Sequence, residues 1–208
     1  MTHADNKTWS VTMLRLQRLF FLLTSASLLV AAPAVAAEWT IVPDGSELSF
    51  VSVKNGDVPV SGRFPGVSGT VSDGETIQGE MNIALDSLDT GNPGRDQNIL
   101  EAFFRVATAG KVARFELLSA KKVADGTPER WQVEGTLHLV GATHKLSFPV
   151  ELVRLSRTER LLVTPASVPI RFADFGLTEA AADLRKRCNH QELLELATVQ
   201  ARLLLRRK

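Results

Sequence analysis

The sequence predicts an all-β domain, folded as an antiparallel sandwich or barrel with one or two short helices, and three observations support this prediction. Several segments alternate apolar and polar residues with a period of two, which is typical of strands that bury one face. Turn-forming pairs such as Asp-Gly, Asn-Gly and Pro-Gly separate these segments at short intervals. The chain has 208 residues, enough to bury a substantial core in one domain. Many short strands joined by regular turns favour a sandwich or a barrel.

The expected strands follow one another along most of the chain. Residues 75–88 give the clearest alternation, because their apolar side chains fall on one parity and their polar side chains on the other. The same pattern marks residues 131–139 and 168–172. Weaker candidates are residues 48–53, 58–64, 67–71, 115–123 and 161–163.

Residues 131–152 are expected to form a hairpin, whose two strands must place their apolar faces on the same side. This condition pairs Leu139 with His144 and leaves a four-residue loop over residues 140–143. In that register His138 and His144 point to opposite faces. They therefore do not converge on one point, as the ligands of a metal site must.

Between Leu88 and Phe104 the strand pattern stops, and the residues predict a loop that leads into one short helix. We expect Asp96 to cap this helix, because aspartate accepts a hydrogen bond from the backbone at helix starts. The side chains expected to face inward are Ile99, Leu100, Phe103 and Phe104. The composition of residues 180–207 favours a helix when taken alone, although alternation after Leu196 also matches a final strand.

The first 37 residues have the order of a cleavable export signal. Arginines precede an apolar run over residues 19–30, and small residues follow it. The run is shorter than the stretch of about 20 apolar residues that spans a bilayer, so an uncleaved anchor is the weaker interpretation. We expect cleavage after Ala36 or Ala37, with Met13 as a candidate true start. The product would be a single domain over residues 38–208, free in the periplasm without stable membrane insertion.

Charge and cysteine content exclude several classes of protein. The formal net charge is +1, and removal of residues 1–37 would change it to −1. A balance this close to zero gives no electrostatic reason to expect nucleic acid as a partner. Cys188 is the only cysteine, so the chain cannot form an intramolecular disulfide. The oligomeric state stays open, a homodimer included.

Few residues combine in a way that predicts chemistry. Cys188 and His190 are two apart, but no third residue is evident to orient such a nucleophilic pair, and an idle thiol is the simpler interpretation. Arg95 and Asp96 allow two interpretations: a salt bridge in a capped loop, or an arginine that meets the phosphate or carbonyl of a ligand. We therefore predict no catalytic residue, no metal site and no cofactor.

Five segments together resemble the YceI-like polyisoprenoid-binding family. They are WTIVPDGSELSFVSVKNGD, SGRFPGVSGTV, LDSLDTGNPGRDQNILEAFF, GTLHLVGATHKLSFPV and DFGL, and they extend over about residues 39–205. The most specific part is the order of Ser87 to Gly91, Arg95 with Asp96, and Phe103 with Phe104. The family often has a histidine two places after the Arg-Asp pair, where this chain has Asn98.

The resemblance implies a lipocalin-like antiparallel β-barrel of about eight strands that encloses an apolar cavity for a long isoprenoid or similar lipid. It also implies a short helix near residues 179–187 followed by a strand that closes the barrel. The residues expected to line the cavity or its mouth are Phe50, Phe64, Met81, Ile83, Arg95, Asp96, Phe103, Phe104, Phe115, Phe148 and Phe172.

These expectations lead to a protein that is not an enzyme and that binds a polyisoprenoid, an isoprenoid quinone or another long-chain lipid for sequestration or transport. Periodicity cannot distinguish a residue that lines a cavity from one in a filled core. One alternative is therefore an envelope-stress or interaction protein with a filled barrel that acts through its surface. A lipid-modifying enzyme is the third hypothesis, and it requires convergent polar groups that the sequence does not show.

Overall fold

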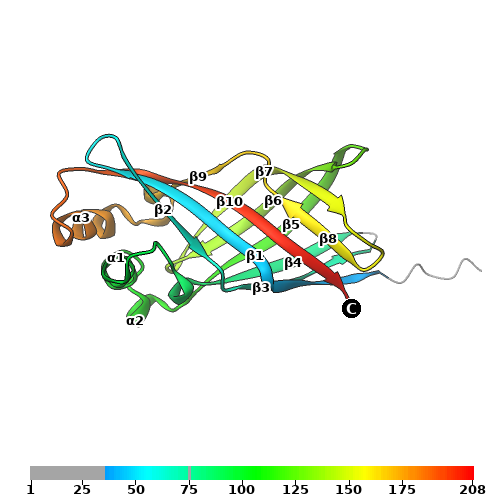
Figure 1. The fold of residues 1–208 in the computed structure, drawn as a ribbon, viewed down its shortest axis with the longest axis horizontal. Helices are drawn as coiled ribbons and strands as arrows, with labels where there is room; N and C mark the ends of the chain where they lie inside the picture. Colours follow the sequence, from blue (N-terminus) through cyan, green and yellow to red (C-terminus); the bar gives the residue numbers. More distant parts are fainter. Residues whose placement is uncertain (1–35, 75) are drawn as a thin grey trace, which may run out of the picture. The chain divides into compact units, whose positions relative to one another are not determined.

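The computed structural model describes residues 36–74 and 76–208, and this part of the chain forms one antiparallel β-barrel (Figure 1). Strands β1 (Glu38–Lys54) and β10 (Leu193–Arg207), the first and the last, pair with each other and close the sheet. The predicted signal peptide lies outside the described residues except for Ala36 and Ala37, so its cleavage stays a prediction.

The barrel confirms the predicted fold class, with ten strands in eight positions. Strand β1 pairs with β3 near its start and with β2 along its second half. Strand β10 pairs with β9 near its start and with β8 along its second half. Strands β2 and β3 therefore fill one position around the barrel, and β8 and β9 fill another. The strands between β1 and β10 are β2 Val58–Phe64, β3 Val67–Asp73, β4 Ile77–Ala84, β5 Val112–Ala124, β6 Glu129–Leu139, β7 Ala142–Arg154, β8 Glu159–Val163 and β9 Val168–Arg171.

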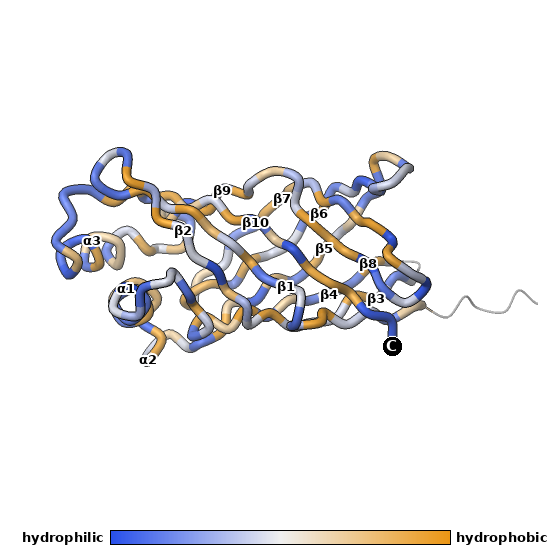
Figure 2. Tube along the Cα trace, viewed as in Figure 1, coloured by the Kyte–Doolittle hydropathy of each residue, from blue (hydrophilic) through white to orange (hydrophobic). Residues whose placement is uncertain are grey.

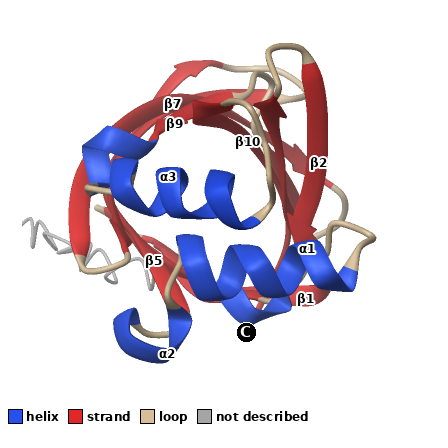
Figure 3. Cartoon of the chain, turned by 90° about the vertical axis from the view of Figure 1, so that its left-hand side faces the viewer, coloured by secondary structure: helices blue, strands red, loops and turns tan. Residues whose placement is uncertain are grey.

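Two helical segments lie across one end of the barrel (Figure 3). The first joins β4 to β5 and the second joins β9 to β10. The elements of the first are η1 Leu85–Ser87, α1 Pro93–Asn98, the π-helix η2 Ile99–Phe103 and α2 Val106–Ala109, and those of the second are η3 Phe172–Phe175 and α3 Thr178–Arg187.

The C-terminal segment follows the resemblance and not its own composition. A helix over residues 180–207 is wrong, because only α3 is helical and β10 is a strand of 15 residues. Alternation places Leu203 and Leu205 in the core. As a strand, this segment also pairs the edge of β1, which would otherwise expose unpaired backbone groups.

The helix cap predicted at Asp96 is also wrong. The side chain of Asn92 caps α1 by accepting a hydrogen bond from the backbone N–H of Arg95 at 3.0 Å, and Pro93 follows at the first helical position. Asp96 instead accepts hydrogen bonds from the backbone N–H and the hydroxyl of Thr90. The carboxylate of Asp96 therefore closes the loop before the helix. Of the side chains expected inward, Phe103 and Phe104 are buried.

The hairpin of β6 and β7 differs from its predicted register by two residues. Leu139 pairs with Ala142 and not with His144, and the turn consists of Val140 and Gly141 alone. Both turn residues have positive φ, at 51° and 79°, a conformation that matches the right-handed twist of the strands. Because the shift is even, every side chain keeps its predicted face.

Apolar side chains fill the half of the barrel away from the helices. Figure 2 shows how hydrophobic and hydrophilic residues alternate along the strands. Trp39, Ile41, Leu203 and Leu205 are buried in this half. The indole of Trp39 donates to Asp73 at 3.0 Å, and the guanidinium of Arg160 lies 3.9 Å from the centre of the Trp39 ring. These contacts form a floor that closes the barrel at this end.

Gly135 on β6 makes room for an aromatic ring inside the barrel. A Cβ atom at this position would lie 2.1 Å from the ring of Phe115 and 2.5 Å from the carbonyl oxygen of Glu116. Gly135→Ala is therefore expected to lower the free energy of unfolding by about 1–3 kcal/mol, as overpacking does. Urea titration measures the change, and Glu134→Ala at the exposed neighbouring position is the control. Equal stability of the two variants would contradict the tight packing.

Candidate functional site

The half of the barrel next to the helices is hollow. It contains a cavity of about 230 Å³. Inward side chains of β1, β2, β4 to β7, β9 and β10 form the wall, and they are almost all apolar. The filled-core alternative therefore holds only for the half that contains Trp39.

The structure places ten of the eleven residues predicted for the cavity or its mouth in this wall. They are Phe50, Phe64, Met81, Ile83, Arg95, Phe103, Phe104, Phe115, Phe148 and Phe172. Asp96 is the exception, because its carboxylate bonds to Thr90. Whether these residues bind a ligand stays a prediction.

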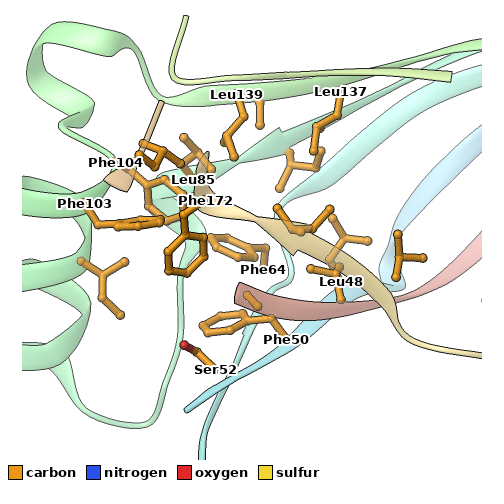
Figure 4. Close-up of a pocket in the computed structure, with 18 of the residues that line it drawn as sticks. Leu48, Phe50, Ser52, Phe64, Leu85, Phe103, Phe104, Leu137, Leu139 and Phe172 are labelled. Carbon is orange, nitrogen blue, oxygen red and sulfur yellow. The ribbon is translucent and has the colours of Figure 1, made fainter. Parts of the chain in front are cut away.

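Phenylalanine rings close the cavity beneath the helices (Figure 4). The rings of Phe103 and Phe172 meet edge to face at a centroid distance of 4.7 Å, and those of Phe103 and Phe104 at 5.1 Å. Phe64 extends the cluster from β2, 6.0 Å from Phe104. Side chains from the end of η2, from η3 and from β2 therefore form one aromatic ceiling.

Polar contacts connect the two helical segments above this ceiling. Arg187 of α3 pairs with Glu101 of η2, and Arg105 pairs with Asp183 at 3.1 Å. Both pairs are exposed, and such pairs contribute little stability. They join α3 to the first helical segment on the outer side of the aromatic ceiling.

Cys188 borders the cavity without a catalytic arrangement. Its sulfur lies 3.6 Å from the side-chain nitrogen of Asn98, which donates to it. Among the described residues no hydrogen bond joins Cys188 to His190, so the nucleophilic pair weighed from the sequence does not form. Asn98, which stands where the family often has histidine, thus contacts a thiol.

The sequence analysis missed four polar residues at the cavity: Ser52, Lys54, Thr164 and His190. Ser52 and Lys54 continue the parity of Phe50 along β1, so alternation was a signal for both. His190 lies in the loop between α3 and β10, and no local pattern could place it there. Arg95 completes this polar group and forms no ion pair with Asp96 in the described part of the chain.

Burial, together with the positive charges of Lys54 and Arg95, lowers the pKa of His190. The unfolded chain therefore takes up this proton first as the pH falls below about 6.5. The contribution of His190 to stability is present above that pH and is lost as the pH falls toward the pKa of the folded state. His190→Asn is expected to reduce the fall in unfolding free energy between pH 7 and pH 5, measured by urea titration. An identical pH dependence in variant and parent would contradict this.

The described residues hold no group of three or more histidine, cysteine, aspartate or glutamate side chains that could bind a metal ion. None of the helices from residue 36 onward is long and apolar enough to cross a membrane.

A family model and several solved structures match this chain. The model of the YceI-like domain matches residues 39–195. A polyisoprenoid-binding domain from Saccharophagus degradans, implicated in plant cell wall breakdown, is 23% identical over 82% of this chain and 98% of its own, with a TM-score of 0.71. BcnA from Burkholderia cenocepacia is 17% identical over 79% of this chain and 98% of its own, with a TM-score of 0.64.

At these identities the solved structures show a shared fold, and no curated protein matches the chain. The family match covers most of the residues that form the barrel and both helical segments that close the cavity. The chain therefore belongs to the YceI-like domain family.

Proposed function

We propose that the protein binds a long-chain apolar lipid, such as a polyisoprenoid or an isoprenoid quinone, in the hollow half of its barrel. The observation that carries this proposal is the cavity itself, which is walled almost entirely by apolar side chains. The similarity to a domain described as polyisoprenoid-binding supports the ligand class. The proposed role is therefore binding.

Affinity would come from burial of the chain. Each methylene that leaves water contributes about 0.8 kcal/mol, and no specific hydrogen bond is needed. Five such carbons, one isoprene unit, would contribute about 4 kcal/mol. Association itself costs about 4–15 kcal/mol, so several units must enter before binding becomes tight.

The cellular role that fits this binding is sequestration or transport of the lipid through an aqueous compartment. It depends on the export signal predicted in residues 1–37, which lie mostly outside the described part of the chain. A barrel shields an apolar chain from water while the lipid crosses the aqueous space between two membranes. The compartment proposed is the periplasm.

A series of isoprenoid alcohols of increasing length tests the proposal. Affinity, measured by displacement of a fluorescent fatty-acid probe, is expected to rise about three- to fourfold per added methylene and then to level off when the cavity is full. An exposed apolar surface that binds lipid nonspecifically would show no such levelling off of affinity with chain length. Affinity that never rises with chain length would overturn the proposal and favour action through the outer surface.

A further inference from the structure

The residue before β1 is already bound to the barrel. Ala36 is exposed, whereas the side chain of Ala37 is partly buried and packs against the core. The backbone carbonyl of Ala37 accepts a hydrogen bond from the backbone N–H of Asp73 at 3.0 Å. Within the described residues, the backbone of Ala37 is thus held at the end of β3 before β1 begins at Glu38.

The carboxylate of Asp73 has three partners at the floor of the barrel. Its Oδ1 accepts a hydrogen bond from the backbone N–H of Ala37 at 2.9 Å. Its Oδ2 accepts from the indole of Trp39 at 3.0 Å and lies 3.3 Å from the guanidinium of Arg160. The side chains of Arg160 and Asp73 are only 23% and 28% exposed, so solvent screens their charges incompletely. Asp73 therefore joins the nitrogen of Ala37 to the floor in a partly shielded place.

The sequence just before this contact has the pattern of a signal-peptidase site. Ala34, Val35 and Ala36 form an A-x-A run, which places small residues at both recognition positions of the cut. Cleavage directly after this run makes Ala37 the first residue. Cleavage one residue later would remove Ala37 and both of its hydrogen bonds to Asp73. The contacts of Ala37 therefore favour the first of the two cleavage sites that the sequence leaves open.

Cleavage after Ala36 changes the chemical nature of the nitrogen that Asp73 binds. Hydrolysis breaks the C–N bond between Ala36 and Ala37, adds the oxygen of one water molecule to the carbonyl carbon of Ala36 and gives both protons of that water to the nitrogen of Ala37. The released segment ends in a carboxylate, and Ala37 carries an ammonium group. The ordinary pKa of an α-ammonium is about 7.7–8.0, so most of these groups are charged at neutral pH. Coulomb attraction is then added to the hydrogen bond.

We infer that Asp73 binds the α-ammonium group that removal of the signal segment creates, and that the segment is cleaved after Ala36. The ammonium group adds an ion pair to the floor of the barrel, where the precursor has only an uncharged amide donor. Processing therefore stabilises the barrel after export and not before. The inference rests on the export signal predicted in residues 1–37 and goes beyond the proposed binding of lipid, on which it does not depend.

Intact mass spectrometry of protein purified from its natural host identifies the first residue. We expect the mass of a chain that begins at Ala37, heavier by one alanine residue than a chain that begins at Glu38. A first residue of Glu38 would overturn the inference, because the nitrogen that Asp73 contacts would then be absent. A chain that still carries the signal segment would overturn it as well.

A double-mutant cycle measures the ion pair itself. Two forms of the chain, which begin at Ala37 and at Ala34, both contain every strand of the barrel. Three extra residues can move the ammonium group by up to about 10 Å. The form that begins at Ala37 is expected to have an unfolding equilibrium constant about three- to tenfold smaller at pH 7, measured by urea titration. With Asp73→Asn in both forms, this difference should fall to less than about twofold.

Glu38→Gln is the matched control for Asp73→Asn. Glu38 is the neighbouring carboxylate at the start of β1, and it pairs with Lys208 and not with the nitrogen of Ala37. The stability difference between the two forms should persist in this variant. A difference of the same size with Asp73→Asn, or its loss with Glu38→Gln alone, would overturn the inference. Circular dichroism shows whether each variant is folded.

Nuclear magnetic resonance gives a second measurement that needs no variant. In the form that begins at Ala37, the pKa of the α-ammonium is expected to lie above its ordinary range, because the carboxylates of Asp73 and Glu38 outweigh the guanidinium of Arg160. The stability advantage of this form should therefore be complete below about pH 7.7 and be lost as the pH rises through the raised pKa. A pKa in the ordinary range, or below it, would overturn the inference.

Discussion

Ala197→Trp is expected to weaken lipid binding by about 100-fold or more while the barrel stays folded. Ala197 lies on β10, pairs with Ser52 across the β1–β10 ladder and borders the cavity. An indole at this position would occupy space that a ligand chain needs, at a cost of about four methylene contacts or 3 kcal/mol. Displacement of a fluorescent fatty-acid probe measures the loss.

Gln200→Trp is the matched control for this substitution. Gln200 lies on the same strand but is exposed on the outer face. The same side chain there should leave affinity unchanged. Equal loss in both variants, or no loss in either, would mean that the ligand does not enter the hollow half of the barrel.

Trp39→Ala is expected to lower the free energy of unfolding by about 3–5 kcal/mol, the usual range when a large aromatic side chain is removed from a core. Trp39 is only 3% exposed and belongs to the floor of the barrel. Its removal also deprives Asp73 of the indole N–H at 3.0 Å and Arg160 of the ring 3.9 Å away. Urea titration measures the loss.

Trp131→Ala provides the comparison. Trp131 is half-buried near the start of β6, and its indole donates to Glu129 at 3.3 Å. Its removal should cost no more than about 2 kcal/mol. A Trp39 variant as stable as the Trp131 variant would contradict the role of Trp39 as the packed floor.

Local alternation predicted the strands and their faces well. It could not predict how strands pair with one another. Met81, Ile83 and Phe115 point inward as their parity requires. The hairpin register was nevertheless wrong by two residues, because a shift of two leaves every face unchanged. The turn at Val140 and Gly141 decided between registers that the hydrophobic pattern could not distinguish.

The helix start illustrates competition between two acceptable residues. Asn92 and Asp96 can both cap a helix, and the sequence analysis chose the second. Pro93 directly after Asn92 was the better signal, since proline favours the first helical position. The Asp96 carboxylate instead accepts a hydrogen bond from the hydroxyl of Thr90, a contact that hydrophobic periodicity does not predict.

The cavity was the part least accessible to the sequence. A side chain such as Leu137 follows the same alternation whether it faces a ligand or another side chain, so only the three-dimensional structure distinguishes the hollow half from the filled half. The loop that carries His190 shows the same limit. The side chain of Asn55 accepts from the backbone N–H of Gln191 at 2.9 Å, and this long-range bond brings the loop to the end of β1.

The central claim is that a lipid occupies this cavity in the native protein. Organic extraction of protein purified from its natural host, followed by mass spectrometry, tests it most directly. We expect about one long-chain lipid per barrel, and its absence from the Ala197→Trp variant purified in the same way. Protein that carries no stoichiometric lipid, or a Trp variant that carries as much as the parent, would contradict it.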